Sequence, residues 1–107
     1  MTNLNDRERG EEAKYALDEE TAFRVTARSN RLLGQWAAAQ MGLTPEETDA
    51  YAKAVVQADF EEGGHEDVIR KVLGDLTAAG VEIDETAVRT ALEEKTVEAR
   101  RQLMSGV

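Results

Sequence analysis

Hydrophobic and polar positions follow a helical period along most of this chain. From about residue 20 onward, apolar residues recur at intervals of three and four, the spacing that lines one face of an α-helix. No segment alternates with a period of two for long enough to form a strand. The pattern predicts an all-α protein, a four-helix bundle with helices at about 20–41, 45–62, 66–79 and 85–104.

Turn and capping residues separate these four segments. The run Thr44-Pro45-Glu46-Glu47 places Thr at the N-cap, Pro at the first helical position and Glu at the third, which is a capping box. Asp84 is a good N-cap for the last helix. Gly42 and Gly80 stand where a left-handed residue commonly ends a helix. Because the connections are short, we expect neighbouring helices to pack antiparallel around one core.

The first of these helices has an apolar stripe that contains the only tryptophan. Placing residues 100° apart puts these on one stripe: Ala22, Val25, Ser29, Leu32, Leu33, Trp36 and Gln40. We therefore expect the core to form around Trp36. Phe23 falls opposite the stripe, and its pattern fits either packing at the helix end or an exposed contact.

The first 19 residues have a different character. Residues 1–20 hold seven acidic and three basic residues, and few large apolar ones. Gly10 costs a helix about 1 kcal/mol relative to Ala, and an isolated helix of this length is marginal in water. We predict a mobile N-terminal arm at 1–19, disordered or frayed when free and helical on a partner, followed by a four-helix domain at 20–107.

Charge and composition narrow the classes of function. The chain has 22 acidic and 13 basic residues, for a net charge of −9. Nucleic acids and anionic membranes repel such a surface, so we expect neither as a partner. The absence of cysteine excludes disulfides, thiolate catalysis and Cys zinc sites. A charged N-terminus and the lack of an apolar run of about 20 residues favour a cytoplasmic protein without membrane insertion.

Few residues suggest catalytic chemistry. His65 is the only histidine, and it is either a metal or phosphate contact at a helix start or simply an exposed residue there. The second interpretation is favoured, because a lone His lacks the partners of a metal site. The acidic corner of Glu61, Glu62, Glu66 and Asp67 lacks the ligand spacing of an EF-hand. We expect no catalytic residue, metal or cofactor, and an interaction protein rather than an enzyme.

A row of arginines stands out on the first helix. Arg24, Arg28 and Arg31 share a face, and no acidic residue occurs between Thr21 and Gly42. The row either pairs with the acidic helix at 45–62, which is the favoured interpretation, or presents a basic face to a ligand or partner. A small-molecule module, for example one that binds an adenine nucleotide, is thus an alternative function.

Short motifs in a fixed order suggest a family. They are Asp6-Arg7-Glu8-Arg9, Glu12-Ala13-Lys14, Asp18-Glu19-Glu20, Asn30-Arg31-Leu32-Leu33-Gly34, Trp36-Ala37-Ala38, Tyr51-Ala52, Ala58-Asp59-Phe60-Glu61-Glu62 and Glu66-Asp67-Val68. In this order and spacing, the chain resembles the zeta subunit of the alphaproteobacterial F-type ATP synthase. The resemblance covers nearly the whole chain and is densest from Asp6 to about Val72.

The resemblance implies an inhibitor of ATP hydrolysis, without a cofactor, that is a monomer when free. In that family the arm becomes a helix at a catalytic interface of the head, formed by the alpha and beta subunits, against the gamma subunit of the rotating stalk. The four-helix domain stays outside as an anchor, and the bound protein is peripheral to the inner membrane. Hydrolysis is blocked while synthesis is largely spared. A non-inhibitory assembly factor is a further alternative.

The resemblance also implies roles for individual arm residues. The polar contacts would be Asp6, Arg7, Glu8, Arg9, Lys14, Asp18, Glu19 and Glu20, and the apolar ones would include Ala13 and Tyr15. Outside the arm, His65 stands where the family commonly has Asp at the N-cap of the third helix, which bears on stability rather than on inhibition. Two arm positions also depart from the family pattern, because Glu11 stands where an aromatic residue is favoured and Gly10 replaces a better helix former. Both departures are expected to weaken the bound helix.

Overall fold

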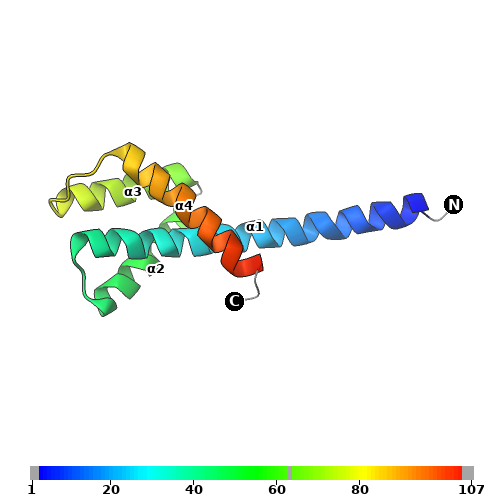
Figure 1. The fold of residues 1–107 in the computed structure, drawn as a ribbon, viewed down its shortest axis with the longest axis horizontal. Coiled ribbons are helices and arrows are strands. Elements are labelled where there is room, and N and C mark those ends of the chain that lie inside the picture. Colours follow the sequence, from blue (N-terminus) through cyan, green and yellow to red (C-terminus); the bar gives the residue numbers. More distant parts are fainter. Residues whose placement is uncertain (1–2, 63, 105–107) are drawn as a thin grey trace.

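The chain forms four helices, seen in a computed structural model that describes the backbone of residues 3–62 and 64–104 and the side chains of residues 20–60 and 64–104. They are α1 (Asn3–Met41), α2 (Pro45–Glu62), α3 (His65–Ala78) and α4 (Glu85–Met104), and the described backbone contains no strand (Figure 1). The all-α prediction is confirmed. The predicted bounds of the last three helices agree with the structure to within one residue.

The first helix differs from its predicted bounds, because α1 begins at Asn3 rather than near residue 20. Residues 3–19 contain no proline and are rich in Glu, Ala, Arg and Lys, which are good helix formers. The helix started in the bundle therefore continues through them. Figure 1 shows this part of α1 projecting away from the other helices, and the molecule is 65 Å long but only 25 by 22 Å across. The mobility of this arm when free stays a prediction.

The starts of α2 and α4 have the predicted caps, whereas α3 begins after Gly64 without a side-chain cap. The backbone N–H of Thr44 donates to Glu47 Oε1 at 2.9 Å, and the N–H of Glu47 donates to Thr44 Oγ1 at 3.2 Å. The backbone hydrogen bond from Thr44 lowers the pKa of the Glu47 carboxyl. At the start of α4, the N–H of Ala87 donates to Asp84 Oδ1 at 2.9 Å. These side chains satisfy N–H groups that a helix start leaves without intrahelical partners.

Two helix ends have a shared geometry that requires glycine. Gly42 after α1 and Gly80 after α3 have φ values of 72° and 83°, in the left-handed region. In each case the N–H of the next residue donates to a carbonyl five residues back, Leu43 to Ala38 and then Val81 to Leu76, both at 3.0 Å. This is the Schellman arrangement, and it confirms both predicted stops.

α1 is the central element of the bundle. It packs against α2, α3 and α4, while α3 also packs against α2 and α4. The buried core is formed by Leu33, Ala37, Val55, Val68, Ile69, Val72, Leu76, Val88, Ala91 and Leu92. All these residues belong to the bundle, so the core lies at the end of the molecule opposite the projecting part of α1 (Figure 1).

The predicted position of Trp36 at the centre of the core is wrong. Trp36 is half-buried at the flank of the core, whose contribution from α1 is centred on Leu33 and Ala37. In the predicted stripe, Val25, Ser29 and Leu33 are buried, Leu32 and Trp36 are half-buried, and Ala22 and Gln40 are exposed. The cause is close helix packing: a Cβ at Gly34 would lie 2.7 Å from Ala52 Cα. Only small residues fit between backbones this close, so the large indole lies to one side.

Polar contacts also join the helices in pairs. Tyr51 Oη of α2 donates to Asp75 Oδ2 of α3 at 2.8 Å, and Lys71 Nζ lies 3.1 Å from the same oxygen. Partial burial, reinforced by the hydrogen bond to the carboxylate, raises the pKa of Tyr51 well above its ordinary value. The hydroxyl therefore remains a donor at every physiological pH.

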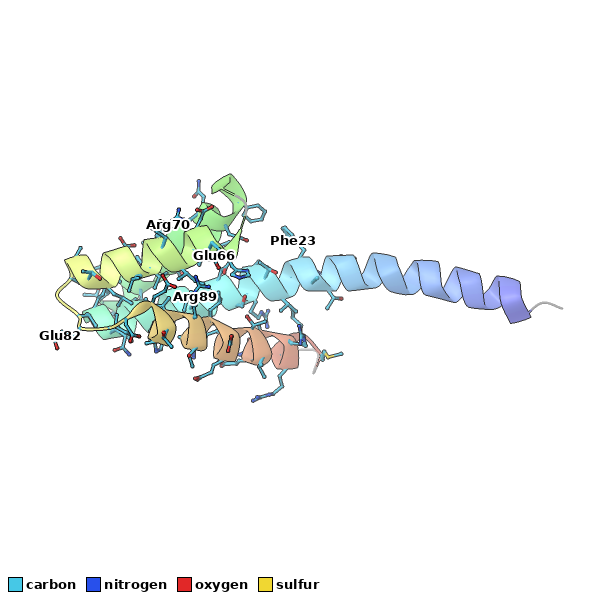
Figure 2. The ribbon with its side chains drawn as sticks, turned by 90° about the horizontal axis from the view of Figure 1, so that it is seen from above. Phe23, Glu66, Arg70, Glu82 and Arg89 are labelled. Atoms are coloured by element: carbon cyan, nitrogen blue, oxygen red, sulfur yellow. The ribbon has the colours of Figure 1, made fainter. Side chains whose placement is uncertain are left out.

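A second polar contact joins α3 to α4. Arg89 donates through both terminal nitrogens to Glu66, at 2.8 and 2.6 Å, and its Nε donates to Glu85 at 3.0 Å. Figure 2 shows Arg89 and Glu66 facing each other from the two helices. The hydrogen bond from Arg89 is the main cause that lowers the pKa of the Glu66 carboxyl. A bidentate pair of this kind restricts the relative orientation of its two helices.

Candidate functional site

The predicted arginine face lies along a groove between α1 and α2. The groove has a volume of about 770 Å³ and is lined by Phe23, Arg24, Ala27, Arg28, Arg31, Lys53, Val56, Gln57, Phe60 and Leu103. We call it the α1–α2 groove. It brings together all three predicted arginines, and it adds Lys53 of α2 and an apolar floor to them. The sequence did not indicate these additions, because they depend on how α2 and α4 pack against α1.

An exposed aromatic pair stands at the end of this groove. The ring centroids of Phe23 and Phe60 are 5.3 Å apart and the planes are tilted by 59°, a favourable arrangement for two aromatic rings. The two residues are nevertheless 57% and 61% exposed. Both interpretations of Phe23 therefore hold, since it packs against the end of α2 and also stays open to solvent. Figure 2 shows Phe23 standing out from α1 where that helix leaves the bundle.

Two of the four basic residues of the groove pair within their own helices. Arg24 pairs with Glu20 of its own helix at 2.7 Å rather than with an acidic residue of α2. Arg28 donates to Gln102 of α4 at 3.3 Å, and Lys53 pairs with Asp49 one turn away at 3.1 Å. The exposed ion pairs Arg24–Glu20 and Lys53–Asp49 contribute at most about 1 kcal/mol each. An incoming anionic group can therefore compete for these cations.

The arm residues named by the resemblance lie almost entirely outside the described side chains. Asp6, Arg7, Glu8, Arg9, Ala13, Lys14, Tyr15, Asp18 and Glu19 are in the projecting part of α1, and only their backbone is described. Glu20 is described, and it is exposed and paired with Arg24. The contacts predicted for the arm therefore stay predictions.

A buried amide, not among the residues predicted to be buried or functional, lies behind the aromatic pair. Asn30 is 1% exposed, and its Nδ2 has no hydrogen-bond partner among the described residues. It borders a narrow space of about 10 Å³ beneath Phe23 and Phe60, which Thr26 and Asp59 also line. The three- and four-residue spacing of Asn30, Leu33 and Ala37 could have placed it on the buried face of α1.

His65, Glu66 and Asp67 lie next to other charged side chains, whereas the side chains of Glu61 and Glu62, the rest of the acidic corner, lie outside the described residues. His65 is the first residue of α3, and its exposed imidazole lies 3.8 Å from a carboxylate oxygen of Glu66. Asp67 pairs with Arg70 at 2.9 Å, and Glu66 pairs with Arg89. Among the residues whose side chains are described, no group of three or more His, Asp and Glu is placed to hold a metal ion. Within the described chain, no helix is both long and apolar enough to cross a bilayer.

The fold has a solved relative. A solution NMR structure of a protein is 47% identical to this chain, covers 79% of it and 96% of its own length, and superposes with a TM-score of 0.69. No curated protein matches the chain.

A protein family matches most of the chain. The family described as ATPase inhibitor subunit zeta matches residues 1–102, which include the projecting part of α1 as well as nearly the whole bundle. The match therefore covers both parts that the sequence analysis distinguished, the arm and the four-helix domain. This chain belongs to the ATPase inhibitor subunit zeta family.

Proposed function

We propose that this protein inhibits ATP hydrolysis by F-type ATP synthase through its N-terminal arm. The arm inserts as a helix at a catalytic interface of the alpha and beta subunits, against the gamma subunit, and the bundle remains outside the head as an anchor. The observation that carries this proposal is the course of α1. The helix runs from Asn3 to Met41, so one element joins a projecting segment to the folded core.

The division of tasks between arm and bundle follows from where the stability lies. The described buried hydrophobic residues run from Val25 to Ala99. Capture of the arm therefore requires no opening of the core. If the arm becomes ordered only when it binds, the contacts that it makes offset the entropy cost of ordering it. Such an arm can enter an interface that opens only briefly during each catalytic cycle.

The arm's composition supports insertion between polar surfaces. Its acidic and basic residues alternate closely in the run from Asp6 to Arg9, and Ala13 and Tyr15 supply apolar contacts. Gly10 lies within α1 and lowers its helix propensity there. The inhibitor blocks the rotation that hydrolysis drives, while the opposite rotation during synthesis releases the arm. The protein then works in the cytoplasm, peripheral to the inner membrane when bound.

The decisive experiment compares two forms of the protein on cognate membranes. We expect the full chain to inhibit ATP hydrolysis and a chain that begins at Glu20 to leave it unchanged, with ATP synthesis little affected by either. Circular dichroism must show that both forms contain the folded bundle. If neither form inhibits, or if both inhibit equally, the arm mechanism is wrong.

A matched pair of charge variants sharpens this test in the full chain. Arg7→Glu combined with Arg9→Glu reverses two arm charges, whereas Arg100→Glu combined with Arg101→Glu makes the same net change at exposed positions of α4. We expect the arm variant alone to lose inhibition. Equal loss in both variants would indicate a general charge effect instead of arm contacts.

The two alternative functions give different results in these assays. If the protein is a non-inhibitory assembly factor, the full chain would pull down the synthase yet leave ATP hydrolysis unchanged. A nucleotide-binding module would respond to adenine nucleotides without any synthase present. Both remain predictions from the sequence.

A further inference from the structure

We propose that the α1–α2 groove is the surface by which the bundle docks on its partner, and that its occupant is an acidic, amphipathic helix of the synthase head. This inference rests on the proposed function, since it names the chemistry that the anchor recognises. The arm would supply inhibition, and the groove would supply a separate part of the affinity.

The composition of the groove fits a protein partner. Arg24, Arg28, Arg31 and Lys53 gather there in a chain whose net charge is −9, so the groove is a local basic exception. Aromatic residues and arginines are the types that most often dominate binding energy at protein interfaces. The exposed Phe23–Phe60 pair beside the arginines gives the groove both types. An acidic partner is complementary to this charge.

The geometry of the groove favours a helix as the occupant. A groove between two packed helices accepts a third helix through its apolar face, with Ala27, Val56 and Leu103 available as the floor. Arg24 and Arg31 are seven positions apart, which is about 10 Å along α1. Two carboxylates that lie two turns apart on one face of an acidic helix are separated by about the same distance.

The same geometry argues against a nucleotide as the occupant. Phosphates are usually held at a helix N-terminus or by a glycine-rich loop, and the groove residues belong to helix bodies rather than to helix starts. The two phenyl rings contact each other at a tilt of 59°, so they do not form a parallel slot for a base. A row of cations spread along α1 also suits separated carboxylates better than one compact polyphosphate.

The place of the groove in the fold adds a further reason. Phe23 lies three residues after Glu20, where α1 leaves the bundle (Figure 2). A partner that holds the arm as a helix therefore meets the aromatic pair and the arginine row immediately beyond it. The backbone of α1 runs without interruption from the arm to the groove.

The test measures binding of the full chain to purified catalytic head that lacks its own copy of this subunit, by surface plasmon resonance. The groove variant combines Arg31→Glu with Phe60→Ala. The control combines Arg100→Glu with Val97→Ala, which makes the same charge change and removes an exposed apolar side chain of α4 outside the groove. Circular dichroism and thermal unfolding check that both variants fold.

We expect the groove variant to bind the head at least about tenfold more weakly, as removal of an interface anchor does, and the control to bind like the wild type. Raising the salt concentration should weaken wild-type binding more than that of the groove variant, because screening acts on the charges that the variant has lost. Equal affinities of the groove variant and the control would overturn the proposal. The proposal would also be overturned if titration with ADP gave saturable amide shifts from Phe23 to Arg31 and the groove variant kept the wild-type affinity for the head.

Inhibition measured in the same samples separates this inference from the proposed function. If the groove variant needs a higher concentration but reaches the same maximal inhibition, docking and arm mechanism both stand. If wild-type protein binds through the groove yet does not inhibit at saturation, the docking surface stands and the arm mechanism fails.

Discussion

Glycine residues show at single positions how packing overrides helix propensity. Gly34 lies inside α1, where an added Cβ would be 2.7 Å from Ala52 Cα and 3.3 Å from Val55 Cγ2. Gly74 lies inside α3, and an added Cβ there would meet nothing within 4 Å. Both residues lower helix propensity to a similar degree. Only the first is required by its neighbours.

This difference predicts opposite effects of the same substitution. Gly34→Ala should destabilise the protein by about 1–3 kcal/mol, because α1 and α2 must move apart. Gly74→Ala should stabilise it by about 0.5–1 kcal/mol, because the unfolded chain loses freedom and no clash arises. Urea denaturation of the two variants provides the measurement. A stabilising Gly34→Ala would mean that the two helices separate easily at this point.

Tyr51 predicts how the protein responds to alkali. Its pKa is raised in the folded state, so the folded protein holds this proton when the unfolded chain, with an ordinary pKa of 10.0, begins to lose it. The contribution of Tyr51 to stability is therefore complete below pH 10 and declines as the pH rises above that value. The free energy of unfolding should fall more steeply above pH 10 in the wild type than in Tyr51→Phe.

At neutral pH, Tyr51→Phe should cost about 1 kcal/mol for the lost hydrogen bond to Asp75. Parallel alkaline slopes for the two proteins would contradict the role given to this hydroxyl.

At the scale of elements, local chemistry determines where helices begin and end. The capping box at Thr44, the Asp84 cap and the two left-handed glycines act within a few residues of each terminus, so they can be recognised from sequence. The start of α1 was missed because no comparable cap stands near residue 20. A helix without a local stop continues as far as its residues permit, here to Asn3.

A bidentate ion pair joins α3 to α4 at the edge of their apolar contact and predicts a response to acid. The pKa of Glu66 is lowered by the hydrogen bond from Arg89. Its contribution to stability is therefore present above the unfolded pKa of 4.5 and is lost as the pH falls through the lower folded value. Arg89→Gln should lower the melting temperature at pH 7 and make the loss of stability below pH 4.5 shallower.

The matched control for Arg89 is Lys53→Gln, which breaks an ion pair within one helix, between Lys53 and Asp49. It should leave the melting temperature and the acid slope nearly unchanged, since such pairs contribute a few tenths of a kcal/mol. If both variants behave alike, the pair between α3 and α4 has no special role.

At the scale of the whole molecule, α1 is both a core helix and a projecting one. Because the described core begins at Val25, a chain that starts at Glu20 should unfold with nearly the free energy of the full chain. Thermal and urea unfolding of the two forms would measure the difference. A much less stable short form would show that the arm also supports the bundle, and the arm could not then act as an independent effector.

The sequence by itself determined the all-α class, three pairs of helix bounds, the main caps and the family, because these depend on periodicity, on neighbours a few residues away and on motifs in order. It could not place Trp36 at the flank or bring Phe60 and Lys53 to the arginine face. Those features depend on how closely α1 approaches α2 and which side it turns toward α4. Close packing of three helices around α1 decided them, since side-chain volumes at Gly34 and Ala37 matter there more than hydrophobicity.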